Sequence, residues 1–328
     1  MKQVTAGAAL LRTAAVCLTA CAASAQPESW QAEWPATDFS ISLVDFSEIV
    51  SGGPPKDGIP AINNPSFLQA ADERRLSQRE PVMTLEISGE VPRAYPIRYL
   101  LWHEIINDTV GETPVAVTYC PLCNSGIVFD RRVGNGAPLT FGVTGKLRHS
   151  DMIMFDRQTE SWWQQAVGEG IVGEHAGRAL KELPAWTESW EQFVGRNPDG
   201  LVMDEPEHHR SYGSNPYRQY DTSERPFLYF GENPPFEIHP LSRVVRVENR
   251  AWPLERLRNA GTLTEHGLEF SWTHGQASPL DTRSIADGRD IGMVRVRDTG
   301  SRLDVAHDVM FAFAFHAFHS DGEWMLGN

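Results

Sequence analysis

Residues 115–131, V-A-V-T-Y-C-P-L-C-N-S-G-I-V-F-D-R, decide how the surrounding chain folds. Before Cys120 apolar and polar side chains alternate, which is typical of a half-buried strand, and residues 127–129 predict the return strand. Cys120 and Cys123 therefore lie on a tight turn between two strands.

The C-P-L-C spacing of this turn is compatible with three kinds of chemistry. A short loop lets two thiolates converge on one metal ion, about 2.3 Å from each sulfur. The same cysteines can cycle between dithiol and disulfide, or form a structural disulfide that closes the hairpin. A second C-x-x-C pair, which would favour zinc, is absent from the sequence. The spacing leaves the three alternatives open.

The composition predicts a mainly β protein with a few short helices, an α+β fold. The 328 residues include 27 glycines, 22 prolines and 10 tryptophans, and few long stretches have helical periodicity. Residues 247–254 echo residues 89–97, residues 268–272 take the place of the cysteine strand, and residues 308–311 echo residues 151–155. Two related β-rich modules packed together would explain this pattern.

The predicted organisation has four parts. They are a signal peptide (1–25), an N-terminal arm (26–80), a cysteine-containing β-rich module (81–235) and a second β-rich module (236–328) that resembles a degraded repeat of the first.

The first 25 residues have the features of an export signal. Lys2 and Arg12 carry positive charge, and residues 13–23 are apolar or small. Cleavage after residues 23–25 is one interpretation; the other is a lipoprotein signal in which Cys21 is lipidated and anchors the chain. Both predict a periplasmic or outer-envelope protein. No later apolar run reaches the ~20 residues of a spanning helix, so no transmembrane span is expected.

A histidine precedes the cysteine strand at a distance that a hairpin can close. Residues 97–107 predict a short helix that places His103 and Glu104 near that strand. His103 with Cys120 and Cys123 would form a Cys₂His set with an open position, which suits copper or zinc. The alternative is a buried structural histidine bonded to a backbone carbonyl.

Charge and motifs exclude several classes of function. A net charge of −14 argues against nucleic acid as a partner, because phosphate binding requires clustered lysine and arginine. The hydrolase motifs G-x-S-x-G and H-E-x-x-H are absent. Asp130 and Asp151 are acids near the cysteine strand, but the sequence reveals no paired carboxylates. Whether the protein is an enzyme stays open.

Four strings of the sequence, in this order, resemble the bacterial "domain of unknown function 3179" family of exported proteins. They are R-A-Y-P-I-R-Y-L-L-W-H-E-I-I-N-D-T-V-G (93–111), V-A-V-T-Y-C-P-L-C-N-S-G-I-V-F-D-R (115–131), L-T-F-G-V-T-G-K-L-R-H-S-D-M-I-M-F-D-R-Q-T-E-S-W-W-Q-Q (139–165) and Y-G-S-N-P-Y (212–217). The resemblance covers most of the chain from about residue 80 onward. It implies secretion and the prominence of His103, Cys120 and Cys123, but no reaction. In one departure, His149 stands where relatives carry asparagine.

These observations lead to two functional interpretations. In the first, the exported protein uses Cys120 and Cys123, joined by His103, to bind a soft metal such as copper or zinc, or it cycles a disulfide between the two thiols. In the second, it is a non-catalytic envelope or binding module in which the two cysteines form a structural disulfide.

Overall fold

The computed structural model describes residues 28–327, so the predicted export signal and Cys21 lie outside the described residues. The prediction of a mainly β protein with a few short helices is confirmed, because strands make up 37% of the structure and helices 15%. The described α-helices are α1 (Glu28–Glu33), α2 (Ile97–His103), α3 (Trp190–Arg196), α4 (Leu254–Ala260) and α5 (Ala312–Phe318). None of these helices has the length and apolar sequence needed to cross a membrane.

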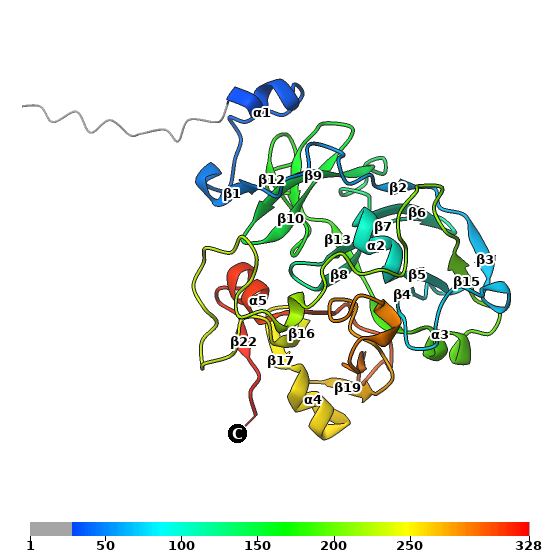
Figure 1. Ribbon diagram of the computed structural model, residues 1–328. Coiled ribbons are helices and arrows are strands. Elements are labelled where there is room, and N and C mark those ends of the chain that lie inside the picture. The colour runs from blue at the N-terminus through cyan, green and yellow to red at the C-terminus, as the bar shows by residue number, and fades with distance from the viewer. Residues whose placement is uncertain (1–27, 328) are drawn as a thin grey trace, which may run out of the picture.

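The strands form five sheets, named here after one strand of each (Figure 1). In spatial order, the β7 sheet contains β13 (Lys181–Leu183), β8 (Ser125–Asp130), β7 (Thr113–Cys120), β6 (Ile105–Val110) and β2 (Ile62–Asn63). The β4 sheet contains β14 (Ala185–Ser189), β4 (Pro81–Leu85), β5 (Arg93–Pro96), β15 (Leu201–Met203) and β3 (Phe67–Gln69).

The other three sheets follow in the same notation. The β9 sheet contains β1 (Ile49–Ser51), β9 (Phe141–Arg148), β10 (Asp151–Asp156), β11 (Trp162–Gln164) and β12 (Glu169–Val172). The β16 sheet contains β21 (Asp308–Phe311), β16 (Arg243–Val247), β17 (Arg250–Pro253) and β22 (Glu323–Trp324). The β19 sheet contains β18 (Thr262–Glu265), β19 (Leu268–Thr273) and β20 (Met293–Asp298).

Two sets of elements follow the same path through space. The first set runs β4, β5, α2, β6, β7 and β8, and the second runs β16, β17, α4, β18, β19 and β20. In each set a hairpin leads into a seven-residue helix, and the helix leads into a three-stranded antiparallel meander. The strand before the helix reads R-A-Y-P in the first set and R-A-W-P in the second.

The β4 and β16 sheets also agree beyond the hairpin. A strand–helix–strand unit, β14–α3–β15 in one and β21–α5–β22 in the other, adds an antiparallel strand on one side of the hairpin and a parallel strand on the other. We count each strand–helix–strand unit with the set whose hairpin it extends. The contacts between the two sets are then reciprocal, because β14 of the first packs against β20 of the second while β21 of the second packs against β8 of the first. Figure 1 shows the second set, in yellow to red, beneath the first.

This topology changes the alignment expected from the sequence. Residues 308–311 echo residues 151–155 in sequence, but β21 occupies the place of β14, whereas Asp151–Asp156 forms β10 in the β9 sheet. The β9 sheet, which follows β8 along the chain, has no counterpart in the second set. The predicted domain division itself stays a prediction.

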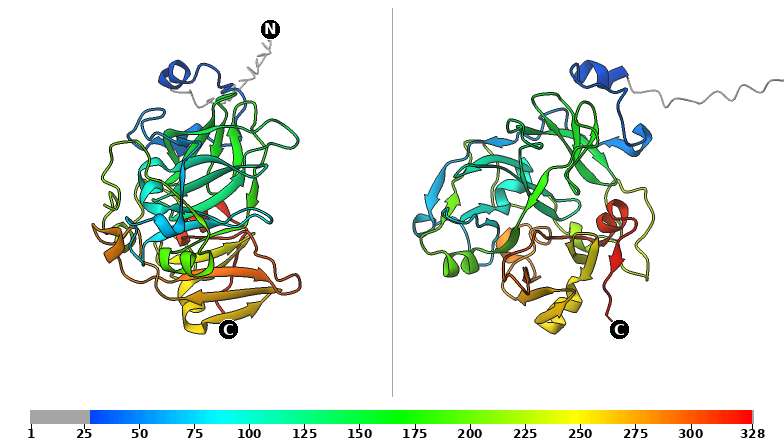
Figure 2. Two further views of the ribbon diagram at one scale, coloured as in Figure 1. Left: turned by 90° about the vertical axis from the view of Figure 1, so that its right-hand side faces the viewer. Right: turned by 180° about the vertical axis from the view of Figure 1, so that it is seen from behind.

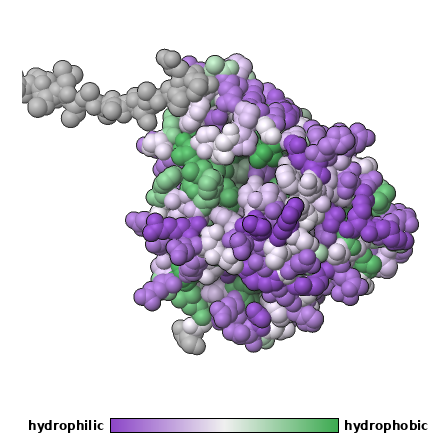
Figure 3. All heavy atoms as spheres, in the orientation of Figure 1, coloured by the Kyte–Doolittle hydropathy of each residue, from purple (hydrophilic) through white to green (hydrophobic). Residues whose placement is uncertain are grey.

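The first part of the described chain, from α1 to β1, packs on the β9 sheet. Trp34 is buried with its ring centroid 4.8 Å from that of Phe155 and 5.4 Å from that of Trp162. The views in Figure 2 show this blue segment at the opposite end of the molecule from the C-terminus. Most of the face in Figure 3 is hydrophilic, which agrees with the net charge of −14.

The predicted helix over residues 97–107 is too long by four residues. Glu104 has a φ of +59°, which ends α2, and Ile105 and Ile106 then enter β6. Both isoleucines are buried in the strand. An apolar pair fits a buried helical turn as well as a buried strand, so it did not distinguish the two.

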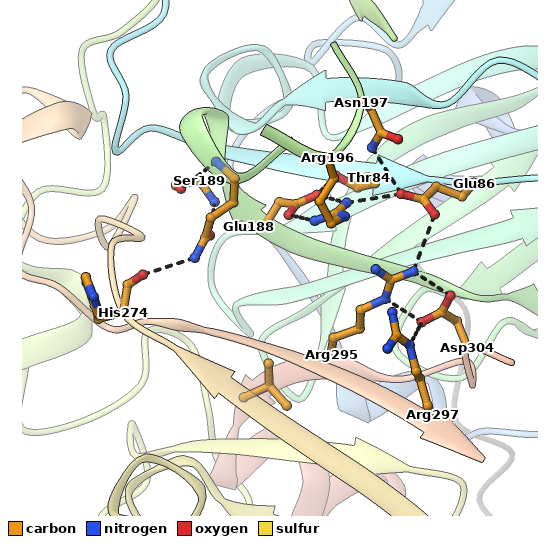
Figure 4. Close-up of polar contacts among 12 residues, drawn as sticks. Thr84, Glu86, Glu188, Ser189, Arg196, Asn197, His274, Arg295, Arg297 and Asp304 are labelled. Carbon is orange, nitrogen blue, oxygen red and sulfur yellow. Dashed lines mark hydrogen bonds and ion pairs between the residues drawn. The ribbon is translucent and has the colours of Figure 1, made fainter. Parts of the chain in front are cut away.

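A chain of ion pairs joins the two sets (Figure 4). Arg196 of α3 pairs with the buried Glu188 of β14 and with Glu86 at 3.0 Å. Glu86 in turn accepts a hydrogen bond from Arg295 of β20 at 3.3 Å. Glu188 also accepts a bond from the Thr84 hydroxyl at 2.5 Å, so this carboxylate is fully compensated.

Replacing Glu188 with alanine should therefore destabilise the fold. The change leaves part of the Arg196 charge and the buried Thr84 hydroxyl without a partner, which costs about 2–4 kcal/mol. Urea unfolding measures the loss. Glu191→Ala, at an exposed position of the same helix, is the control and should change stability by less than about 0.5 kcal/mol. Equal urea midpoints for the two variants would contradict the structural role of this ion pair.

Candidate metal centre

The two cysteines lie where the sequence predicts, on a tight turn between β7 and β8. Cys120 is the last residue of β7, and its Cα pairs with that of Ser125 at the start of β8. Asn124 closes the turn with a φ of +51°, a conformation that asparagine tolerates well. Both cysteines are buried free thiols, so the structural disulfide of the second interpretation is not present in this structure.

The second set of elements holds the cysteine turn in place. The backbone N–H of Phe311 donates to the Cys123 carbonyl at 2.8 Å. The Asn124 amide donates to the Val309 carbonyl at 2.6 Å, and the Ser125 hydroxyl donates to Asp308 at 2.9 Å. Because these partners all belong to β21, the packing of β21 on β8 fixes the direction of the thiols.

Asp151 joins the cysteines from the β9 sheet. One ligand atom from each of Cys120, Cys123 and Asp151 lies within 4.8 Å of the other two, and all three residues are buried. We call these three residues the thiol–carboxyl trio. In the described chain this is the group of three whose spacing suits one ion. Sequence reasoning noted Asp151 as an acid but could not bring it to the cysteines, because β10 belongs to another sheet.

The turn before Asp151 also faces the thiols. The Ser150 carbonyl lies 3.5 Å from the Cys123 sulfur and 3.9 Å from the Cys120 sulfur, so it accepts from the S–H groups. His149 and Ser150 both have positive φ, of 50° and 65°. Asparagine is favoured in such a two-residue hairpin turn, so histidine is a less usual residue at position 149.

Asp151 is positioned by one of its two carboxylate oxygens. Oδ2 accepts from the Gln164 amide at 2.7 Å and from the Ala166 backbone N–H at 2.9 Å. Oδ1 is buried and has no partner with full hydrogen-bond geometry among the described residues, although the thiols of Cys123 and Cys120 interact with this carboxylate and act to lower its pKa. A buried carboxylate oxygen without such a partner is costly, and a cation is one way to satisfy it.

Glu104 brings a second buried carboxyl group to the same region. Burial, and then the charge of Asp151, raise the pKa of Glu104 to about 8. Burial also raises the pKa of Asp151 to about 6 and the pKa values of both thiols above their usual range. In the part of the chain that the structure describes, no ion pair involves either carboxylate. At neutral pH Glu104 and both thiols therefore keep their protons, whereas Asp151 is largely ionised and can attract a cation.

His103 lies in a different environment from the one predicted. Its Nδ1 is 2.7 Å from the Pro60 carbonyl and its Nε2 is 2.6 Å from the Tyr212 hydroxyl, so both ring nitrogens are occupied. Burial lowers the pKa of His103 to about 4, which keeps the ring neutral. His103 is not part of the trio. The hydrogen bond to a backbone carbonyl is the one that the structural alternative expects.

A cavity of about 370 Å³ adjoins the trio. Glu104 lines it, as do Leu122 and Met152, which are sequence neighbours of Cys123 and Asp151. The remaining wall is mostly apolar or aromatic and includes Val143, Leu147, Tyr217, Tyr220 and Phe227. A small molecule in this cavity would contact Glu104, while the trio itself lies behind the lining.

The fold and the site define a mainly β protein with a buried thiol–carboxyl centre beside a cavity. The chain belongs to the family described as "Protein of unknown function (DUF3179)", whose model matches residues 56–322. No curated protein and no solved structure is significantly similar to the chain. The predicted family is thereby confirmed, and the function has to be argued from the site.

The raised pKa of Glu104 predicts how the metal-free, reduced protein responds to pH. A carboxyl group that binds its proton more tightly in the folded chain stabilises the fold at low pH. The protein loses this stability as pH rises from the usual pKa of 4.5 to the folded pKa of about 8. The melting temperature should therefore fall between pH 5 and pH 8, and Glu104→Gln should reduce this fall. Glu112→Gln, at an exposed position, should leave the fall unchanged. Identical pH dependence in the wild type and Glu104→Gln would show that this carboxyl is not perturbed.

Proposed function

We propose that the protein is an exported metal-binding protein whose centre is formed by Cys120, Cys123 and Asp151. The observation that carries this proposal is the convergence of three buried ligand atoms within 4.8 Å of one another. Two sulfur ligands select a soft or borderline ion, so zinc and copper(I) suit the set best. Asp151 takes the place predicted for His103, whose nitrogens are engaged with Pro60 and Tyr212.

The electrostatics of the site support a cation. Thiols and carboxyls that resist ionisation in an apolar surrounding become good ligands once a metal replaces their protons. Asp151 is well prepared for this role, because Gln164 and Ala166 hold Oδ2 while Oδ1 has no partner with hydrogen-bond geometry. Outer hydrogen bonds of this kind orient a metal ligand and tune its basicity.

The cavity supports an accessible rather than a closed centre. Structural zinc sites use four protein ligands, whereas catalytic or exchangeable sites use three and keep one position open. The trio supplies three ligands and adjoins the cavity. The open position would therefore be reached by a small molecule in the cavity.

Redox cycling of the two thiols is the second candidate function, favoured by the presence of two free thiols on one tight turn. Redox-active cysteines are normally activated by a lowered pKa, through a helix N-terminus or a nearby basic group. Burial raises the pKa values of Cys120 and Cys123 instead. Metal binding is therefore the better-supported of the two.

Export to the periplasm or the outer envelope is part of the proposal. It is supported by the signal-like residues 1–25, with Cys21 as the residue that would carry a lipid anchor. In an oxidising compartment an unprotected dithiol tends to oxidise, so a bound metal would also keep Cys120 and Cys123 as thiolates. The acidic charge of −14 supports a partner other than nucleic acid.

Metal content and a thiol count on protein purified from the periplasm test this proposal. We expect one zinc or copper ion per chain and two free thiols after chelation and denaturation. Cys120→Ser should weaken binding by more than the roughly 10–100-fold that loss of an outer hydrogen bond costs, while circular dichroism stays unchanged.

Met152→Leu is the matched control for this test. It replaces a soft sulfur atom in the cavity wall that is outside the trio, so the metal content should not change. A wild-type protein with no metal and no free thiol would reject the metal centre in favour of a disulfide. Full metal content in Cys120→Ser would reject the ligand assignment.

A further inference from the structure

Glu104 occupies a backbone position that normally suits glycine. It follows α2 with a φ of +59°, and its N–H donates to the Leu100 carbonyl at 2.8 Å. A side chain in this left-handed region usually costs about 1 kcal/mol or more unless it is glycine, asparagine or aspartate. A glutamate here needs a reason.

The second set of elements shows how the same position is built without a site. Gly261 follows α4 with a φ of +67°, and its N–H donates to the Leu257 carbonyl at 2.9 Å. The backbone carbonyls of the two residues also accept equivalent hydrogen bonds. The Glu104 carbonyl accepts from Tyr119 of β7 at 2.9 Å, and the Gly261 carbonyl accepts from Trp272 of β19 at 2.7 Å.

The comparison separates the role of the backbone from the role of the side chain. Glycine satisfies every backbone bond of this motif in the second set, so the motif does not require a glutamate. Backbone strain that the fold does not require is concentrated at functional sites. The carboxyl group of Glu104 is therefore the part of the residue that needs an explanation.

The Glu104 carboxyl is a polar group within a mostly apolar cavity wall. Tyr217, Tyr220 and Phe227 supply aromatic surface around it. Lys146 also lines the cavity, but its ammonium group is held by Glu33 at 2.8 Å. Arg218 also lines the cavity and is exposed, and among the described residues no basic side chain forms an ion pair with Glu104.

We propose that Glu104 is the ligand-contacting residue of this cavity, and that its ligand is a small, mainly apolar molecule with one hydrogen-bond-donating group, an amine or an alcohol. The location rests on the proposed function, because the cavity adjoins the trio, but binding to Glu104 does not require a metal. A protonated carboxyl group can pass its proton to an amine and pair with the resulting ammonium, or accept a hydrogen bond from an alcohol through its carbonyl oxygen. The aromatic walls favour an apolar body and a cationic head. An anionic ligand brings no hydrogen-bond donor to the Glu104 carboxyl group, and it would meet the negative charge of Asp151, which also acts on Glu104.

The ligand class is tested with three probes of similar shape on metal-free, reduced protein. They are benzylamine, benzyl alcohol and benzoate, measured by titration calorimetry. We expect benzylamine to bind most tightly, benzyl alcohol more weakly and benzoate not at all. Tighter binding of benzylamine than of benzyl alcohol identifies an amine site, and tighter binding of benzyl alcohol identifies an alcohol site. Benzoate binding as tightly as benzylamine, or no binding by either donor, overturns the proposal.

The role of Glu104 is tested with Glu104→Gly and its counterpart Gly261→Ala. A Cβ added at Gly261 meets no atom within 4 Å, so Gly261→Ala measures only the cost of a side chain in this backbone conformation. It should lower the melting temperature. Glu104→Gly should not lower it, yet should weaken binding of the better donor probe by about tenfold or more, the usual effect of losing a buried hydrogen bond.

The outcomes for the two proposals can be told apart. If Glu104→Gly lowers the melting temperature as much as Gly261→Ala does, or binds the probe as well as the wild type, Glu104 is a structural residue and the inference fails. If the wild-type protein holds no metal but Glu104→Gly loses affinity for the better donor probe, the proposed metal centre is wrong and the inference about Glu104 stands.

Discussion

Two thiols and two carboxyl groups share one buried region of this molecule, and the described residues provide no ion pair for the carboxylates. This crowding of acidic groups is the constraint on which the site depends. Burial raises the pKa values of Glu104, Asp151 and both thiols, and the charge of Asp151 adds to the rise for Glu104 and the thiols. Glu104 and the thiols keep their protons at neutral pH unless a cation replaces them, and the geometry of the thiols with Asp151 suits an ion.

The fold assembles this region from distant parts of the chain. The β7 sheet contributes the cysteine turn, the β9 sheet contributes Asp151, and the end of α2 contributes Glu104. The second set has no cysteine, but β21 supplies the hydrogen bonds that fix the turn. One set of elements thus carries the chemistry while its counterpart acts as a rigid support.

The backbone around the site is unusual in a consistent way. Glu104, Asn124, His149 and Ser150 all have positive φ, and each lies at the end of an element that delivers a site residue. Such conformations are maintained only where the surrounding structure fixes them. Ten other non-glycine residues with positive φ lie elsewhere in the described chain, so the conformation alone does not mark the site.

Local features of this chain could be predicted from the sequence. Alternation around Cys120 identified the two strands and the turn. Proximity of Glu104 to the cysteine strand also followed from local spacing. Asp151 could not be assigned to the site, because the pairing of β10 with β9 and β11 depends on long-range packing that leaves no local signal.

The same limit explains two other differences. The sequence suggests His103 as a ligand because it cannot reveal the partners of the imidazole ring. In the structure these partners are Pro60 and Tyr212. The echo between residues 151–155 and 308–311 compared short β-strands of similar composition. In the strand order of the sheets, residues 308–311 (β21) take the place that β14 has in the β4 sheet. Side-chain period identifies strands but does not identify their neighbours.

The absorption spectrum of the cobalt-substituted protein tests the central claim most directly. Metal-free, reduced protein is titrated with Co²⁺ while the near-ultraviolet and visible bands are recorded. A thiolate centre formed by Cys120, Cys123 and Asp151 predicts saturation at one Co²⁺ per chain, a sulfur-to-cobalt charge-transfer band, and the intense visible bands of a four-coordinate ion. If cobalt keeps the weak spectrum of its hydrated six-coordinate ion at every ratio, the trio does not bind metal and the account is wrong.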